Sequence, residues 1–288
     1  MEDVLTIATA EGVRIYAVCA SSLVRYACKR HSCSHLASAA LGRAMAGALL
    51  LAATMKDGER ISLQFKGDGP LGTVVADAQN YQVRGYVENP DAFLPLKNGK
   101  LDVGGGIGHG NIVVTRYLQN AEPFTGYCEL ENGEIASDLT KYLYVSEQVP
   151  SSVALGVLVD KEGNVAAAGG YFIQAMPGCS EEVLVKLEEN VARTPYVTQL
   201  LELGYTPEKI IAIVGRGLAV DIKKSLPVEF KCRCSRERIK TALAALDEAA
   251  QKEILQDPVT EAHCQFCNTT YSFERKELEA VFKKNNNQ

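Results

Sequence analysis

Two close pairs of cysteines near the carboxyl end place the strongest constraint on how this 288-residue chain can fold. The first pair, Cys232 and Cys234, has the spacing Cys-x-Cys, and the second, Cys264 and Cys267, has the spacing Cys-x-x-Cys. Residues 235–263 separate the pairs. Two such pairs can supply all four ligands of a tetrahedral metal ion, because each pair spans one edge of the tetrahedron. The sequence therefore predicts that the four cysteines bind one Zn²⁺ per chain.

The chain has nine cysteines in total, although its first residues do not resemble a secretory signal. Residues 1–10 carry two acidic side chains and no basic cluster. Thiols are kept reduced in the cytosol, so clustered cysteines there indicate metal binding or redox sensing more than structural disulfides. We therefore expect a cytoplasmic protein.

The cysteine quartet can act in two ways, and its spacing leaves both open. Four thiolates leave no coordination position for water, which argues against a hydrolytic centre. The site can instead fold the tail or sense oxidants. With Zn–S bonds of about 2.3 Å the sulfurs lie roughly 3.8 Å apart, whereas a disulfide bond needs about 2.05 Å. Oxidation of either pair therefore removes two thiolate donors.

The tail from 232 to 288 is close to the lower size limit for independent folding, so loss of its metal should unfold it. Structural zinc contributes on the order of 10–16 kcal/mol in small domains.

The tail is expected to form two helices and a strand. Ser235 should cap a helix carrying Ile239, Leu243 and Leu246. Tyr271 and Phe273 follow on a strand, and Leu278, Val281 and Phe282 mark a last helix. The tail holds nine basic and nine acidic residues, which argues against a nucleic-acid-binding zinc finger.

Upstream of the tail, the pattern predicts an α+β fold with a mixed, largely antiparallel sheet. Strands are expected at 4–8, 13–18, 61–65, 72–78, 82–87, 112–117, 125–130, 153–160 and 164–174, and helices at 35–55 and 133–148. Strands that follow one another through tight turns favour antiparallel pairing. The apolar stretch 36–53 contains Arg43 and much Ala and Gly, so we expect a buried core helix and not a membrane span.

After Pro177-Gly178 the composition changes to amphipathic helix. Ser180 and Thr206-Pro207 each provide a helix start. The apolar positions that follow are Val183, Leu184, Leu187, Val191, Ile210, Ile211, Ile213 and Val214. This segment is too short to bury itself and must lie on the sheet domain. We thus predict a core domain at 1–178, a helical linker at 179–228 and a zinc-binding domain at 229–288.

Two further motifs carry weaker signals. Residues 104–110, GGGIGHG, resemble a phosphate loop but are followed by a strand pattern, so a tight turn and no nucleotide are predicted. Cys28, His31, Cys33 and His35 crowd into CKRHSCSH, which could form a second metal or redox site; we favour a surface loop. Three other cysteines, Cys19, Cys128 and Cys179, are isolated and are expected to be buried or bystander thiols.

Several motifs resemble one known family over essentially the whole chain, the redox-regulated 33 kDa chaperonins. They are Leu41-Gly42-Arg43, the turn Gly67-Asp68-Gly69-Pro70-Leu71-Gly72, Val83-Arg84-Gly85-Tyr86 running on to Asn89-Pro90, Gly133-Glu134-Ile135-Ala136 with Asp138-Leu139, Ser146-Glu147-Gln148, Gly169-Gly170-Tyr171, and the two cysteine pairs followed by Asn268 and Tyr271. The quartet is the most specific of these. The chain departs from the family at CKRHSCSH and at Asp257-Pro258, which stands where a glycine turn is more usual.

The resemblance implies an ATP-independent holding chaperone, not an enzyme. It implies that the reduced, zinc-bound form is inactive. Peroxide with mild heat, or hypochlorous acid, would form the disulfides Cys232–Cys234 and Cys264–Cys267 and release zinc. Tail and linker would then unfold, unfolding client proteins would bind the uncovered apolar surface, and the oxidised chain would form a homodimer. On this interpretation the client-binding residues are Val183, Leu184, Leu187, Val191, Ile210, Ile211 and Val214.

Two alternatives belong to other functional classes. A thiol–disulfide oxidoreductase could use Cys264 and Cys267, but the pair lacks a βαβ context. A zinc-ribbon module could bind nucleic acid, but the tail is neutral and the whole chain has a net charge of -5. We expect no nucleic-acid, membrane or nucleotide partner.

Overall fold

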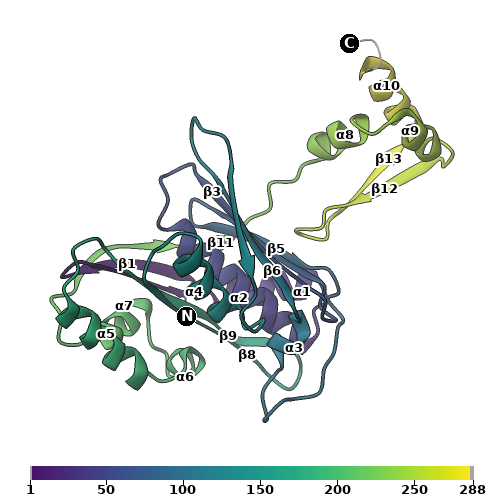
Figure 1. The fold of residues 1–288 in the computed structure, drawn as a ribbon. Helices are drawn as coiled ribbons and strands as arrows, with labels where there is room; N and C mark the ends of the chain where they lie inside the picture. Colours follow the sequence, from purple (N-terminus) through teal and green to yellow (C-terminus); the bar gives the residue numbers. More distant parts are fainter. Residues whose placement is uncertain (1, 286–288) are drawn as a thin grey trace. The chain divides into compact units, whose positions relative to one another are not determined.

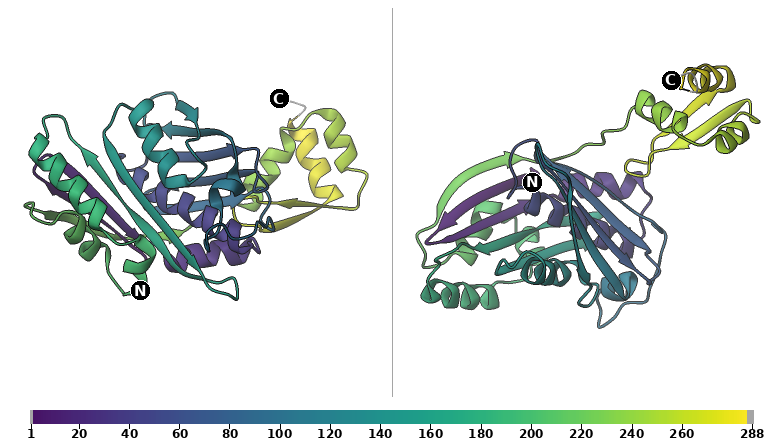
Figure 2. Two further views of the ribbon diagram at one scale, coloured as in Figure 1. Left: turned by 60° about the horizontal axis from the view of Figure 1, so that its bottom comes forward. Right: turned by 45° about the horizontal axis from the view of Figure 1, so that its top comes forward.

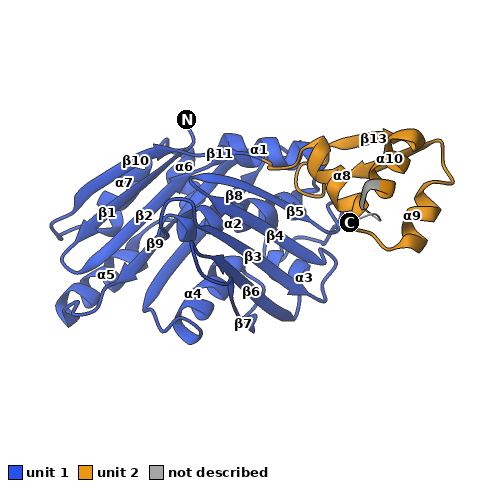
Figure 3. Cartoon of the chain, turned by 90° about the horizontal axis from the view of Figure 1, so that it is seen from above, with its two compact units in different colours: residues 1–231 blue, residues 232–288 orange. Residues whose placement is uncertain are grey.

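The computed structural model describes residues 2–285, so the outermost ends of the predicted first and last domains lie outside the described residues. The chain divides into two compact units, unit 1 within residues 1–231 and unit 2 within residues 232–288 (Figure 3). The predicted linker, residues 179–228, belongs to unit 1. Its behaviour as a separate domain stays a prediction.

Unit 1 contains two sheets, and together with its helices they confirm the predicted α+β class. The five-stranded sheet has the order β10 (Asp221–Pro227), β1 (Val4–Ala10), β2 (Val13–Cys19), β9 (Val165–Ala175) and β8 (Ser151–Val159). The six-stranded sheet has the order β11 (Glu229–Phe230), β5 (Gln82–Val87), β4 (Thr73–Gln79), β3 (Arg60–Gly67), β6 (Gly110–Tyr117) and β7 (Phe124–Glu129). Neighbouring strands are antiparallel except for the short parallel pair β11–β5.

Helix α2 (His35–Ala52) is the centre of unit 1 and contacts both sheets (Figure 1). It is the one helix of the described residues that is long and apolar enough to cross a membrane, but 83% of it is buried inside the protein. Ser34 caps it by accepting a hydrogen bond from the amide of Ala37. Gly42 allows close packing, since a Cβ there would lie 2.6 Å from a methyl group of Val24. The predicted core helix is confirmed.

Two hairpins form where the sequence predicted them. β1 and β2 pair through Glu11 and Gly12, which both have positive φ angles, 44° and 85°. Such angles suit the tight turns that match strand twist. β8 and β9 pair around Lys161-Glu162-Gly163, where Gly163 has a φ of 87°.

The glycine-rich segment forms a one-turn helix, α3 (Val103–Ile107), so the predicted simple tight turn is wrong in detail. The Asp102 carboxylate accepts a hydrogen bond from the amide of Gly105 at 2.9 Å and caps this turn. Strand β6 follows, as expected.

The predicted surface loop at CKRHSCSH is correct only for residues 31–34, which form a turn between two helices. Helix α1 (Ser21–Arg30) extends through Cys28, which is only 5% exposed and lies in the main core cluster. The helix continues this far because Leu23, Val24, Ala27 and Cys28 share one apolar face. His35 begins α2 and directs its Nε2 to the carbonyl of Lys161, 3.3 Å away.

Helices α5 (Glu181–Arg193), α6 (Val197–Glu202) and α7 (Pro207–Val214) cover the face of the five-stranded sheet opposite α2 (Figure 2). Ser180 caps α5 and Thr206 caps α7, as predicted. The helices bury Val183, Leu187, Val197, Leu200, Leu201, Ile210, Ile211 and Val214 against the sheet. The expected docking of this amphipathic segment is thereby confirmed. Its end is not helical, however, because residues 221–227 form the edge strand β10 beside β1.

Unit 2 combines a hairpin, β12 (Val259–His263) and β13 (Thr270–Glu274), with the helices α8 (Arg236–Ala244), α9 (Glu248–Ile254) and α10 (Arg275–Asn285). Ser235 caps α8 as predicted. Leu246 lies beyond the end of this helix and is 40% exposed, so its assignment to the helix is wrong. The buried cluster of this unit consists of Ala244, Phe273, Leu278 and Phe282.

Glu208 joins α7 to the edge of the five-stranded sheet. Its Oε1 accepts hydrogen bonds from the hydroxyls of Thr6 on β1 and Ser225 on β10, at 2.7 and 2.6 Å. Burial alone would raise the pKa of this carboxyl, but the hydrogen bonds outweigh it and lower the pKa to about 2. The charged form is therefore the one that holds α7 in place.

We predict that Glu208→Gln weakens the docking of α7, by about 1 kcal/mol because the carboxylate is partly solvated. Amide exchange across α7 should become faster at neutral pH. Glu181→Gln is the matched control, because Glu181 is an exposed acid in the first turn of α5. Equal exchange rates in the two variants would contradict the role of Glu208.

The same contact predicts a pH dependence. Because the folded-state pKa lies below the ordinary value of 4.5, the stabilisation is present above that pH and is lost as the pH falls towards about 2. The difference in unfolding free energy between wild type and Glu208→Gln should thus shrink between pH 7 and pH 3 in urea titrations. A difference that stays constant over this range would show that the Glu208 charge does not contribute.

Candidate metal centre

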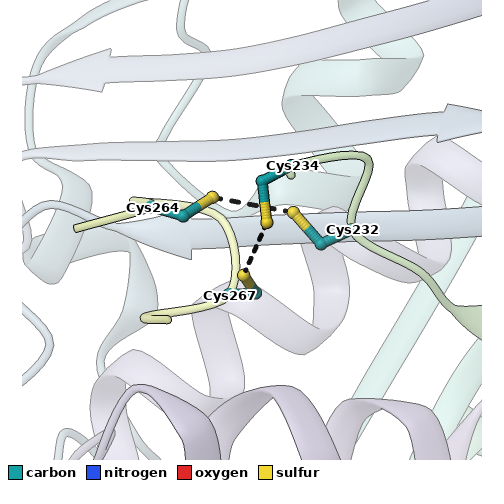
Figure 4. A group of neighbouring side chains, drawn as sticks. All are labelled: Cys232, Cys234, Cys264 and Cys267. Carbon is teal, nitrogen blue, oxygen red and sulfur yellow. Dashed lines mark hydrogen bonds between the residues drawn. The ribbon is translucent and has the colours of Figure 1, made fainter. Parts of the chain in front are cut away.

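The four predicted ligands come together in unit 2 (Figure 4). Their Sγ atoms all lie within 4.8 Å of one another. The sulfur of Cys232 is 3.6 Å from that of Cys264, and the sulfur of Cys234 is 3.4 Å from that of Cys267. Within the described part of the chain, this is the one group of three or more His, Cys, Asp or Glu side chains whose arrangement could hold a metal ion.

Each pair occupies a turn next to regular structure. The first pair lies between β11 and the Ser235 cap of α8, and the second lies in the loop of the β12–β13 hairpin. In that loop the amides of Cys267 and Asn268 donate to the carbonyl of Cys264, at 3.3 and 2.7 Å. Asn268 has a φ of 52°, a left-handed conformation that asparagine tolerates. The loop thus folds the second pair into one compact turn.

Arg236 connects the first pair to the rest of the unit. It stands two residues after Cys234, and its guanidinium lies 4.4 Å from the centre of the Phe273 ring. It also donates to the carbonyl of Ser272 at 2.8 Å and forms an ion pair with Glu277. Lys240 binds the same carboxylate, and these two cations lower the pKa of Glu277. Residues of α8, β13 and α10 therefore hold the two turns against each other.

The thiols differ in exposure and in proton affinity. Cys264 and Cys267 are buried, whereas Cys232 and Cys234 are half-buried. Burial raises the pKa of Cys264 to about 12 and also raises that of Cys234. Burial has the same tendency at Cys267, but hydrogen bonds from Thr269 and Cys234 outweigh it and lower the pKa of Cys267 to about 7. Neighbouring thiols at these distances cannot all ionise easily without a compensating positive charge.

This donor set fits a tetrahedral, thiolate-binding cation. The two sulfur separations are close to the roughly 3.8 Å expected for tetrahedral zinc with Zn–S bonds of about 2.3 Å. Four soft sulfur ligands favour zinc over magnesium or calcium, which prefer oxygen. The site is therefore consistent with zinc, and no ligand position is left for water.

Tyr271 is a site residue that the sequence analysis placed on a strand and in a family motif, without a role at the metal site. Its hydroxyl lies 3.1 Å from Sγ of Cys234, and this contact raises the pKa of Tyr271 to about 12. Strand alternation is the signal that could have found it, since Tyr271 and Phe273 share one face of β13. Arg236 and Glu277 had no such signal, because exposed charges on helices are common.

The other candidate residues belong to unit 1. The predicted client-binding residues belong to α5 and α7, where five of them are buried against the sheet and Val191 is partly buried. Leu184 is half-buried. Cys28 and Cys33 lie at the end of α1, and Cys19 and Cys128 are single buried thiols.

Comparison with known proteins gives consistent matches along the chain. A family model described as Hsp33 protein matches residues 3–274. The 33 kDa chaperonin of Desulforamulus reducens is 42% identical over 289 residues, covering 99% of this chain and 98% of that protein. The 33 kDa chaperonin of Listeria monocytogenes serotype 4a is 40% identical and covers 94% of each chain. The crystal structure of the 33 kDa chaperonin of Thermotoga maritima superposes with a TM-score of 0.92 at 35% identity, over 100% of both chains.

We predict that Tyr271→Phe weakens metal binding at the quartet by about ten-fold, because the phenol supports the Cys234 sulfur from the outer shell. Competition with a chromogenic chelator, with Zn²⁺ as the probe, would measure the change. Tyr127→Phe is the control, since Tyr127 is an exposed tyrosine on β7. An unchanged affinity in Tyr271→Phe would remove Tyr271 from the site.

Proposed function

The chain belongs to the Hsp33 family, whose members are chaperones and not enzymes, and on this premise we propose that it is a redox-regulated, ATP-independent holdase. It would keep unfolding proteins from aggregating under oxidative stress in the cytoplasm. The observation that carries the proposal is the convergence of four thiols within 4.8 Å in a unit with a small apolar core.

In the proposed inactive state, Cys232, Cys234, Cys264 and Cys267 hold one Zn²⁺ as thiolates. The cation would supply the positive charge that keeps four thiolates together and would link the hairpin loop to the segment before α8. The other contacts that keep the inactive form folded come from the chain's own residues. Arg236 and Lys240 hold α8 to α10 through Glu277, and α5–α7 stay docked on the sheet.

In the proposed activation step, each cysteine pair is oxidised to a disulfide, Cys232–Cys234 and Cys264–Cys267. The two sulfurs of a pair lose two electrons to the oxidant, and a peroxide is reduced to water or hydroxide. Each bridge takes two thiolates out of the donor set. Proximity leaves the choice of partners open, because the 3.6 Å contact of Cys232 with Cys264 and the 3.4 Å contact of Cys234 with Cys267 run between the pairs. Short sequence separation favours closure within a pair.

Unfolding of unit 2 and of the linker is the proposed route to client binding. The candidate client-binding residues are largely buried in the inactive form. They are Val183, Leu184, Leu187, Val191, Ile210, Ile211 and Val214. Release of α5–α7 would expose this face together with the sheet face beneath it. Two oxidised chains could then cover part of the exposed surface by forming a homodimer, which we include in the proposal.

The central prediction is that only the oxidised protein suppresses client aggregation. Light scattering of a thermally unfolding client should fall when the chain has been treated with peroxide at mildly elevated temperature, and should be unaffected by the reduced, Zn²⁺-loaded chain. In Cys264→Ser/Cys267→Ser, the difference between oxidised and reduced samples should disappear.

Cys179→Ser is the matched control, because Cys179 is a partly exposed cysteine of unit 1. It should keep the full difference between the two redox states. If oxidised wild type protects no better than reduced wild type, the redox-regulated function is wrong. Peptide mapping of the oxidised chain would identify the bridged cysteines.

A second prediction concerns the docked linker. Ile211 is fully buried, so Ile211→Ala should cost about 2–4 kcal/mol of docking stability. Less oxidation should then be needed before the variant protects a client. Leu203→Ala, which removes an apolar side chain that is 73% exposed, is the control and should behave like wild type. The linker proposal fails if both variants need the same peroxide exposure as wild type.

A further inference from the structure

Helix α1 ends in a motif that brings two cysteines of unit 1 together. Ser32 has a φ of 50°, in the left-handed region. The amide of Ser32 donates to the carbonyl of Lys29 at 3.3 Å, and the amide of Cys33 donates to the carbonyl of Cys28 at 3.0 Å. These two bonds define a Schellman helix end, in which the first and last residues of the motif commonly pack against each other. Here those two residues are Cys28 and Cys33.

The side chains follow the backbone into contact. The helix end places the Cys33 side chain beside that of Cys28, and Cys28 Sγ lies 3.9 Å from the carbonyl of Ser38 in the first turns of α2. Cys28 is buried in the core cluster, and Cys33 packs against that cluster while remaining partly exposed. The contact with Cys33 lowers the pKa of Cys28, because a thiol donor stabilises a neighbouring thiolate.

We propose that Cys28 and Cys33 are a second redox-active dithiol, which closes to a reversible disulfide when a peroxide-type oxidant reaches the chain. Both residues lie in unit 1, and the inference does not depend on the proposed function of the quartet. It gives the two cysteines of the segment CKRHSCSH a chemical role that does not require a second metal site. His35 points to Lys161 instead of to the cysteines, so a metal site is not the better interpretation.

The reaction needs no partner other than the oxidant. One thiolate gives an electron pair to a peroxide oxygen, and hydroxide leaves as a sulfenic acid forms. The second thiolate attacks that sulfur and displaces a second hydroxide, which completes the S–S bond. In sum, two thiols and one hydrogen peroxide give one disulfide and two waters. Whichever sulfur reacts first, the partner that resolves it is already in contact.

The bridge would join the end of α1 to the segment that leads into α2. Ser34, the next residue after Cys33, caps α2 and donates its hydroxyl to the carbonyl of Ala92 at 2.6 Å. The disulfide therefore closes at a junction that is already anchored on both sides. Unit 1 would acquire an additional covalent constraint under the same conditions that oxidise the quartet.

Peptide mapping of the full-length protein tests the proposal directly. The Zn²⁺-loaded, reduced chain is treated with increasing hydrogen peroxide, its free thiols are alkylated, and the protein is digested with trypsin. Cleavage after Arg25, Lys29, Arg30 and Arg43 separates Cys28 and Cys33 into peptides 26–29 and 31–43. A bridge would join these two peptides, and reduction with dithiothreitol would release them. Cys33→Ser and Cys33→Ala should lose the joined species while the quartet peptides oxidise as in wild type.

The outcomes are distinct. A joined 26–29/31–43 species that is reversible and absent from both variants supports the proposal. Free, alkylated thiols at Cys28 and Cys33 over the whole peroxide range overturn it, whatever the quartet does. A bridge from either cysteine to Cys19 or Cys128, or irreversible oxidation of Cys33 alone, also overturns it. Failure of the quartet to oxidise would contradict the proposed function. It would not change the conclusion about a bridge between Cys28 and Cys33.

Discussion

The convergence of four thiols is the interaction in unit 2 that most needs a compensating positive charge. Sulfurs 3.4–3.6 Å apart cannot all carry negative charge without a cation between them, since like charges at such distances repel strongly. The apolar cluster of the unit is small, with Ala244, Phe273, Leu278 and Phe282 as its buried members. Arg236 and Lys240 add ion pairs, but partly exposed ion pairs contribute little on their own. In the proposed function, the charge and oxidation state of the quartet would therefore govern whether unit 2 is folded.

Unit 1 distributes its stability differently. Helix α2 is buried between the two sheets, so one face of the five-stranded sheet belongs to the largest core cluster. The opposite face is covered by α5–α7, which form a separate cluster with β1, β2 and β9. These helices could detach from the sheet without disturbing the face that packs against α2. Contacts such as those of Glu208 with Thr6 and Ser225 would then contribute to the free energy needed to detach them. This arrangement is suited to a local transition that exposes apolar surface while the main core stays folded.

The sequence predicts what depends on local pattern. The cap residues Ser180, Thr206 and Ser235 and the hairpin at Gly163 are local signals, and the structure confirms each. Pairing between distant strands is not local. β2 pairs with β9 and β3 with β6, so the division into two sheets cannot be derived from strand order alone. The edge strand β10 has the exposed, charged sequence DIKKSLP, in which no alternation marks a buried face.

The nine cysteines differ in their reactivity toward oxidants because their surroundings differ, and the sequence alone does not show those surroundings. Burial raises the pKa of Cys19 to about 12 and raises that of Cys128, and buried protonated thiols react slowly with oxidants. The quartet is held together by a hairpin loop and a helix cap that are far apart in sequence. Cys28 and Cys33 are held together by one left-handed serine, which the spacing Cys-x-x-x-x-Cys does not reveal. A reversible disulfide needs a second sulfur within reach, and in the described structure that condition separates these six cysteines from the solitary Cys19, Cys128 and Cys179.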